Sequence, residues 1–436
     1  MGKCISFGKI YKKYNYILLT VIFKILKEYI LFGVNYRSSF KEFKLLETDT
    51  QKYLSKHKYI HQMYCFFGIF IISLFINKYQ KGTFKLSFLH KNENEKITIK
   101  ENDNSKLSFI IIFIIIILWI IEDPIIKLYK SNFTDLDFWM LELLILSYLN
   151  AKMFNEQIYK HHKLSIYINL IICMVKIIMI ILSLLYKDPN NISLYIKYTF
   201  LIPILIIIYL VLITLRSYIN IKLKTFFDIK YIDIIEILII YGLLGTLINL
   251  IFCTITTFEK CNTSVKEYFC KVPYQGNDYI HNSSDLYLDS FSLYFKTLNG
   301  DINRYYSRIE ILIEIFLVFL GIIINYIYKI FFFLVIRDLS PMHVIFSYSI
   351  NNILPKLILP IYTLIYEGSF FSKNAIDNID MKYTVGFFMN IFSLFSFSIY
   401  LEIIQLNCYG LDYNTKQSID SRSDKEKIEL LGPIEI

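Results

Sequence analysis

The stretch Ile232–Thr257 reads IDIIEILIIYGLLGTLINLIFCTITT, and it decides the fold class. Apart from two acidic residues near its start, the stretch is almost entirely apolar. A helix needs about 20 apolar residues to cross the roughly 30 Å of hydrocarbon in a bilayer. A helix also satisfies all of its own backbone hydrogen bonds, which lipid cannot do. The stretch therefore predicts a transmembrane helix.

Nine other apolar stretches of similar length are separated from one another by polar segments. The ten predicted spans are Tyr14–Val34, His57–Asn77, Ser108–Tyr129, Leu136–Phe154, Leu164–Tyr186, Leu194–Leu215, Ile232–Thr257, Arg308–Ile336, Pro341–Tyr366 and Thr384–Leu406. With 55% hydrophobic residues among 436, the chain is too apolar for a soluble domain of this length. We expect an all-α, multi-pass integral membrane protein with ten transmembrane helices, in an endomembrane or in the plasma membrane.

The positive charge of the chain is concentrated between the apolar stretches. The net charge is +9, and the predicted loop after the sixth span carries Arg216, Lys222, Lys224 and Lys230. Basic residues in such loops contact lipid headgroups and fix the orientation of the helices. We therefore expect membrane lipids as partners and no nucleic acid.

The N-terminal segment 1–13 carries a lipidation pattern. Gly2-Lys3-Cys4-Ile5-Ser6 fits the myristoylation motif at Gly2, with Cys4 placed for palmitoylation, and three lysines follow. The alternative is a chance match. Acylation at Gly2 and Cys4 would put the N-terminus in the cytosol, and ten spans would then place the tail 407–436 there as well.

In that orientation the long segment 258–307 forms an outer loop, and features of an oxidising compartment fall on the outer side. Four glycosylation sequons occur on this side, at Asn132, Asn191, Asn262 and Asn282. The first two lie close to the membrane, so we expect modification at Asn262 and Asn282. Cys261 and Cys270 share the outer loop, which predicts a disulfide, the alternative being two free thiols.

Ten spans divide into two halves of five, residues 14–186 and 194–406. An odd number of helices in each half forces the halves into opposite orientations, as in the inverted repeats of secondary transporters. The fourth span contains Ser147-Tyr148-Leu149-Asn150, and its counterpart, the ninth, contains Ser347-Tyr348-Ser349-Ile350-Asn351. Each follows an Asp-Leu pair. We therefore predict two inverted five-helix repeats.

The chain resembles the drug/metabolite transporter superfamily, which includes nucleotide-sugar transporters, in its architecture along the whole length. The shared features are ten helices in two inverted halves, a short fourth helix followed by a basic turn, and Leu339-Ser340-Pro341 entering the ninth helix. The cysteine-bearing outer loop is similar to that of the chloroquine-resistance-transporter branch. The helices are poorer in glycine than those of many members. The resemblance implies a homodimer through the fifth and tenth helices.

Polar and charged side chains inside a span are costly in lipid, so each needs a pairing, cavity or substrate role. The candidate substrate-binding residues are Lys176, Ser349, Asn352, Lys356, Glu142 and Glu314. In the ninth span, Ser349, Asn352 and Lys356 share one helix face, although Lys356 could instead extend to the interface. Lys176 could neutralise Glu142 or bind an anionic substrate. Glu142 and Glu314 are candidates for proton coupling.

These residues predict a solute transporter that works by alternating access on a small-molecule substrate, with an anionic metabolite as one option. A non-transporting scaffold or receptor is the alternative. An intramembrane lipid-modifying enzyme is less favoured, because only His343 and His61 lie near spans, both toward the ends. No CxxC pair or His/Cys cluster predicts a metal site, and we expect no cofactor.

Overall fold

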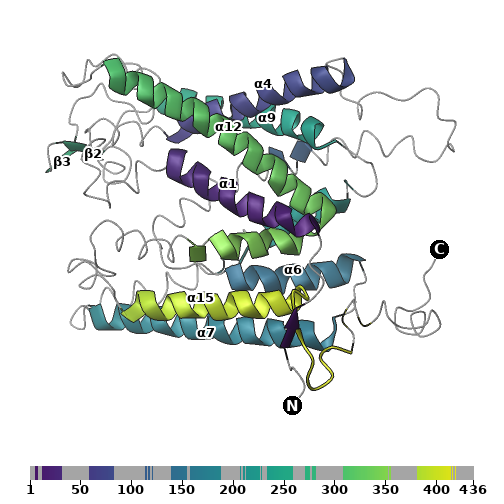
Figure 1. Cartoon of the computed structure of the whole chain (residues 1–436). Helices are drawn as coiled ribbons and strands as arrows, with labels where there is room; N and C mark the ends of the chain where they lie inside the picture. Colours follow the sequence, from purple (N-terminus) through teal and green to yellow (C-terminus); the bar gives the residue numbers. More distant parts are fainter. Residues whose placement is uncertain are drawn as a thin grey trace. The chain divides into compact units, whose positions relative to one another are not determined.

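The computed structural model is mostly helical over the residues that it describes (Figure 1). Those residues are 5–7, 12–31, 58–82, 139–154, 158–187, 213–225, 233–258, 271–274, 277–280, 308–351 and 381–413, with single positions within 113–120, 207–211, 227, 353–354 and 415–418. Most of the predicted third span, Ser108–Tyr129, therefore lies outside the described residues.

Within the described ranges, seven long helices make up most of the fold. They are α1 (Asn15–Leu31), α4 (Lys58–Lys81), α6 (Trp139–Phe154), α7 (Lys160–Lys187), α9 (Ile234–Phe258), α12 (Arg308–Asp338) and α15 (Met381–Tyr400). Residues 213–225 and 341–351 are helical as well, and a short 3-10 turn, η1 (Lys12–Tyr14), precedes α1. The strands are β1 (Ile5–Phe7), β2 (Lys271–Tyr274), β3 (Asn277–Ile280) and β4 (Ile404–Leu406).

Three described helices are long and apolar enough to cross a membrane, judged by length and composition. They comprise Gln62–Lys81, Ile234–Ile251 and Val318–Asp338, and Gly386–Tyr400 is a shorter apolar helix. Helices of this length and composition indicate a membrane protein, because they match the thickness of a bilayer and leave no backbone polar group unpaired in lipid.

The structure corrects the predicted ends of several spans. α7 begins at Lys160, four residues before the predicted start, and α4 continues to Lys81, past the predicted end at Asn77. Residues 213–225 are helical, although Arg216, Lys222 and Lys224 were predicted to lie in a loop. The reason is that lysine and arginine are good helix formers, so a helix continues beyond the point where its sequence stops being apolar.

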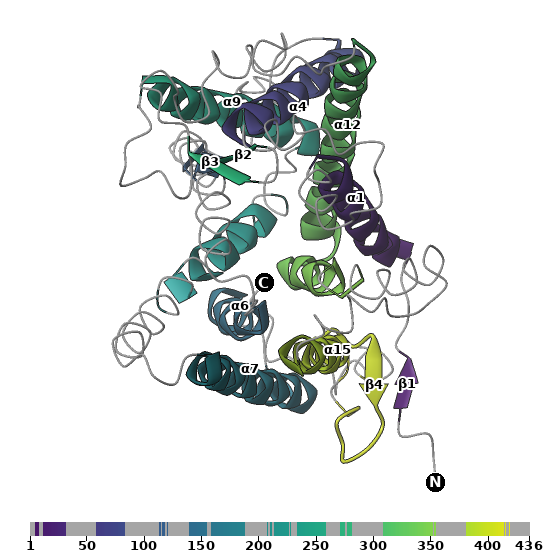
Figure 2. The same ribbon diagram turned by 90° about the vertical axis from the view of Figure 1, so that its left-hand side faces the viewer.

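The predicted tenth span, Thr384–Leu406, is also too long at its C-terminal end. α15 ends at Tyr400, and Ile404–Leu406 forms β4. β4 pairs antiparallel with β1, with Ile5 opposite Leu406 and Phe7 opposite Ile404 (Figure 2). Apolar residues after Tyr400 therefore belong to a strand, a distinction that hydropathy alone does not make. A second two-stranded sheet pairs β2 with β3 inside the predicted outer loop.

The chain divides into two compact units. One comprises residues 1–21, 122–228 and 334–436, and the other comprises residues 22–121 and 229–333. Each unit takes segments from both predicted halves. Compact packing units and structural repeats are different divisions of a chain, so the predicted five-plus-five repeat stays a prediction.

In the second unit, α4 packs closely against α9. A Cβ atom built on Gly242 would lie 2.5 Å from the backbone nitrogen of Phe70 and 2.9 Å from the backbone oxygen of Phe66. One turn along α9, a Cβ on Gly245 would overlap the ring of Phe66, which also meets Tyr241 edge to face at 5.0 Å. Small residues permit this approach of two backbones, as is common between helices in membranes.

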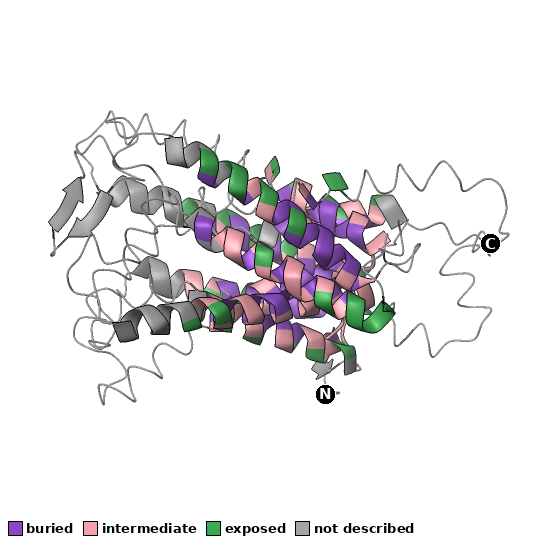
Figure 3. Cartoon of the chain, turned by 90° about the horizontal axis from the view of Figure 1, so that it is seen from above, coloured by how far each residue is buried: buried purple, intermediate pink, exposed green. Residues whose placement is uncertain are grey.

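In the first unit, α7 packs against both α6 and α15. Buried and exposed positions occur on the same helices (Figure 3). On α7, for example, Ser165 and Asn169 are buried, whereas Tyr167, Ile171 and Met174 are exposed apolar side chains. This pattern is inverted relative to a soluble helix, because apolar side chains face outward and polar ones face the neighbouring helix, as expected for a helix surrounded by lipid.

Candidate functional site

A line of buried polar residues joins α7 to α15. On α7, His161, Ser165 and Asn169 follow one another at intervals of four, so they lie on one helix face. All three are at most 2% exposed. On α15, Asn390, Ser393 and Ser396 follow at intervals of three and face the same contact. We call the residues Ser165, Asn169, Lys176, Asn390, Ser393 and Ser396 the α7–α15 seam.

Hydrogen bonds connect the two sides of this seam. The hydroxyl of Ser165 donates to the backbone oxygen of Ser396 at 2.7 Å. The amide nitrogen of Asn169 donates to the backbone oxygen of Ser165 at 2.9 Å and to the hydroxyl of Ser396 at 3.1 Å. The hydroxyl of Ser393 donates to the amide oxygen of Asn169. The seam therefore holds two helices together through polar groups, which compensates for the weak hydrophobic attraction between helices in lipid.

Lys176, predicted as a substrate-binding residue, lies at one end of the seam. Its side chain is buried, and its ammonium nitrogen donates to the amide oxygen of Asn390 at 2.6 Å. Burying a charge is costly unless it is hydrogen-bonded or paired. A lysine kept in the interior at this cost is a strong candidate for a residue that acts on a solute.

Glu142 and Arg216 form an ion pair in the same unit. Glu142, in the first turn of α6, is 2% exposed, and its carboxylate lies 3.5 Å from the guanidinium of Arg216. The guanidinium also lies 5.8 Å from the ring centroid of Tyr348. Arg216 was predicted to lie in a cytoplasmic loop, yet it is helical and pairs with a buried carboxylate. Through Tyr348 as well, Arg216 connects the predicted fourth and ninth spans to the residue that follows the predicted sixth span.

The other predicted substrate-binding residues are less informative. Ser349 is fully buried, and its hydroxyl donates to Phe346 of its own helix at 2.8 Å. Asn352 and Lys356 lie outside the described residues. Glu314 lies in α12, but its side chain is not among those described. The predicted polar face of Ser349, Asn352 and Lys356 therefore stays a prediction.

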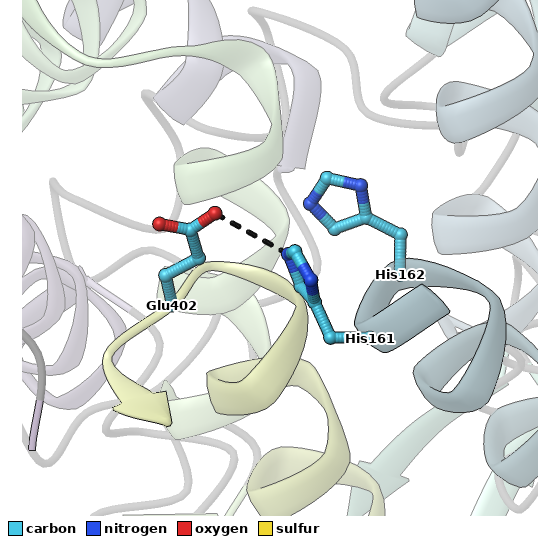
Figure 4. Close-up of side chains that lie close together, drawn as sticks. All are labelled: His161, His162 and Glu402. Carbon is cyan, nitrogen blue, oxygen red and sulfur yellow. Dashed lines mark ion pairs between the residues drawn. The ribbon is translucent and has the colours of Figure 1, made fainter. Parts of the chain in front are cut away.

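A histidine cluster lies near the other end of the α7–α15 contact (Figure 4). His161 and His162 stand in the first turn of α7, and Glu402 lies two residues after the end of α15. The Nε2 atom of His161 lies 3.3 Å from a carboxylate oxygen of Glu402, and the two imidazole centroids are 4.0 Å apart. The expectation that only His343 and His61 lie near spans was wrong, because α7 starts before the predicted boundary and buries His161.

His162 takes part in the start of α7. Its Nδ1 atom accepts a hydrogen bond from the backbone N–H of Tyr159 at 3.3 Å, as a capping-box side chain does at a helix N-terminus.

Sequence analysis missed charged residues of the second unit. Lys329 of α12 is buried, and its ammonium lies 4.8 Å from the ring centroid of Tyr241 and 5.4 Å from that of Phe332. Lys81, the last residue of α4, pairs with the fully buried Glu236 at 2.5 Å. The signal that could have found them is the presence of Lys329 and Glu236 inside predicted spans.

The predicted modification sites cannot be compared with the structure. The pair Cys261 and Cys270, the sequons Asn262 and Asn282, and the acylation sites Gly2 and Cys4 all lie outside the described residues. They stay predictions.

One prediction concerns the seam itself. We expect Ser393→Ala to lower the free energy of unfolding by about 1–2 kcal/mol, because the buried amide oxygen of Asn169 loses a hydrogen-bond donor. Thermal unfolding of the purified protein in detergent measures the effect. Ser398→Ala is the matched control on α15, since that hydroxyl donates only within its helix, to Leu394. Equal stability losses for both variants would contradict a bridging role for Ser393.

Comparison with known proteins does not assign a function to these residues. No protein-family model matches the chain, and no curated protein matches it.

Proposed function

We propose that the protein is a multi-pass membrane transporter of a small solute that works by alternating access, with Lys176 in its substrate site. The observation that carries the proposal is the buried ammonium of Lys176, held by the amide of Asn390 between α7 and α15. A cation in this position can bind an anionic solute, such as a phosphorylated metabolite or a nucleotide sugar.

The pairing of the helices supports two inverted repeats. In the five-plus-five division, α4 and α9 are the second and seventh spans, and α7 and α15 are the fifth and tenth. Each of these helices packs against its own counterpart, α4 on α9 and α7 on α15. Counterparts in two repeats meet in this way when the repeats are related by a two-fold axis that passes between them. Inverted repeats around a central site are common among secondary transporters.

A scaffold or receptor without transport is the second candidate. The ion pairs Glu142–Arg216 and Lys81–Glu236 favour it, because paired charges can serve stability alone. Lys176 distinguishes the two candidates. In a transporter its loss removes flux and preserves the fold, whereas in a scaffold its loss changes stability or nothing.

The test is uptake into proteoliposomes that contain the purified protein, using a panel of labelled anionic metabolites. We expect Lys176→Met to lower uptake of the accepted solute by at least about tenfold, the equivalent of 1.4 kcal/mol of lost binding. Lys163→Met is the matched control, since Lys163 is an exposed lysine of the same helix, and it should stay within about twofold of the unmodified protein.

Size-exclusion chromatography of each variant shows whether the fold is kept. Uptake by Lys176→Met equal to that of Lys163→Met would remove Lys176 from the substrate site. If the well-folded unmodified protein takes up no member of a panel that also includes neutral and cationic solutes, the scaffold candidate replaces the transporter.

A further inference from the structure

The histidine cluster at the junction of α7 and α15 has the composition of a metal site. His161, His162 and Glu402 each offer one ligand atom, and these atoms lie within 4.8 Å of one another. Two imidazoles and one carboxylate are the protein ligands of many zinc sites. Three ligands in a tetrahedral zinc site lie about 3.3 Å apart, as bond lengths of about 2.0–2.1 Å require. The His161–Glu402 pair already stands at this distance, 3.3 Å.

His161 is the second observation that points to a ligand. Its side chain is 97% buried, and neither ring nitrogen has a hydrogen-bond partner among the described residues. A buried imidazole normally donates from one nitrogen and accepts at the other. Leaving both unsatisfied is costly, and coordination of a cation by Nε2 would relieve that cost. Figure 4 shows the ring directed toward Glu402, with the ring of His162 beside it.

His162 is oriented by the start of α7. The N–H of Tyr159 occupies its Nδ1 atom, which leaves Nε2 as the nitrogen available for a ligand. A hydrogen bond to the other ring nitrogen is the usual way in which proteins fix the orientation of a metal-binding histidine. In a regular helix, the side chains of successive residues point in different directions. We therefore attribute the close approach of the His161 and His162 rings to their position in the first turn of α7.

Glu402 comes from the opposite side of the cluster. It lies two residues after the end of α15 and has φ = 58°, a left-handed conformation that residues other than glycine adopt rarely. The C-terminal end of a helix attracts cations through its unpaired carbonyl groups. The carboxylate and the end of α15 therefore supply the negative potential that a divalent cation needs beside the two imidazoles.

We propose that His161, His162 and Glu402 bind a divalent transition-metal ion, Zn²⁺ being the best match. Imidazole and carboxylate ligands suit zinc and its first-row neighbours better than Ca²⁺ or Mg²⁺, which prefer oxygen alone. Three protein ligands leave a fourth position for water. The ion joins the first turn of α7 to the segment that leads from α15 into β4, and so locks the α7–α15 contact at this end. This inference does not depend on transport.

The experiment measures zinc bound to the full-length protein, purified in detergent with a tag that contains no histidine. The protein is stripped with a chelator, incubated with ZnCl₂, passed through a desalting column and analysed for metal. We expect about one Zn²⁺ per chain, and loss of most of it in His161→Gln and Glu402→Gln. His61→Gln removes a histidine of α4 outside the cluster and should keep the full amount.

A third variant separates ligand loss from misfolding. Glu402→His supplies a different zinc ligand at the same position, giving the three-histidine set that proteins also use. Histidine tolerates a positive φ better than most residues. We expect Glu402→His to bind zinc again where Glu402→Gln does not, and Co²⁺ in the unmodified protein to show the visible absorption of tetrahedral nitrogen and oxygen coordination.

Two results would overturn the proposal. One is a stripped and reloaded unmodified protein that retains no zinc. The other is equal zinc retention by His161→Gln and His61→Gln, which would place the bound metal elsewhere on the chain.

Discussion

Lys81→Met should lower the free energy of unfolding by about 3 kcal/mol, because it leaves the buried carboxylate of Glu236 without its closest cation. The ammonium of Lys81 lies 2.5 Å from Glu236 and 3.4 Å from Asp233. Glu236 is fully buried in the first turn of α9, so water cannot replace the lost partner. Thermal and denaturant unfolding in detergent measure the loss.

The charges of the ion pair are also placed favourably relative to the dipoles of α4 and α9. Asp233 caps α9, accepting a hydrogen bond from the backbone N–H of Ile235 at 3.1 Å, and the carboxylates stand at the positive end of that helix. Lys81 stands at the negative end of α4. Its removal therefore costs the favourable interaction at the end of α4 as well as the pair.

Two further variants identify the cause of the loss. Lys152→Met removes an exposed lysine in the last turn of another helix, α6, and should change stability by no more than about 0.5 kcal/mol. Adding Glu236→Gln to Lys81→Met should recover a large part of the loss, since the carboxylate that lacked its cation is gone. Lys81→Met with the stability of Lys152→Met would show that the ion pair contributes little.

We expect a second large effect at the α4–α9 crossing, where Gly242→Ala should cost about 2–3 kcal/mol. The added methyl group would lie 2.5 Å from the backbone nitrogen and 2.8 Å from the Cα atom of Phe70. These are backbone atoms, so no side chain can turn away and the two helices have to separate. The same unfolding measurements apply, with disulfide trapping between cysteines placed on α4 and α9 as a direct measure of helix separation.

Gly386→Ala is the matched control for this variant. Gly386 is also helical, in α15, but a Cβ there meets no described atom within 4 Å. Alanine should stabilise that position by up to about 1 kcal/mol through its helix propensity. Gly245→Ala should fall between the two, because its methyl group meets the side chain of Phe66 and no backbone atom among its nearest neighbours. A Gly242→Ala protein as stable as the Gly386→Ala protein would contradict the close crossing.

Much of the fold follows from local sequence. The apolar stretches that the structure describes are mostly helical, since hydropathy and backbone pairing act within about 20 residues. The predicted ends of the helices were less accurate. α7 begins earlier than predicted, because lysine and histidine can also be part of a helix. The predicted tenth span ends too late, because the short apolar segment after α15 forms a strand. β4 needed β1 as a partner, and two segments so far apart in sequence carry no local signal of pairing.

The candidate site was predictable only in part. Lys176 was found because a charge in the middle of an apolar stretch is rare and costly. Its partner Asn390, and the seam residues Asn169 and Ser393, were missed, since serine and asparagine inside a span carry little cost when they bond to a neighbouring helix. The partner of His161 is Glu402, on a different helix end, and only the folded chain brings them together.

The pairing of β1 with β4 restricts how many times the chain between them can cross the membrane. Two hydrogen-bonded strands cannot lie on opposite sides of about 30 Å of hydrocarbon, so Phe7 and Ile404 share one side of the bilayer. Any path that leaves a surface and returns to it crosses an even number of times. The chain between these residues therefore obeys a parity rule: ten crossings satisfy it, whereas an α1 that only rests on the membrane surface would leave nine. An experiment that finds an odd number of membrane crossings between Phe7 and Ile404 would be incompatible with the pairing of β1 and β4.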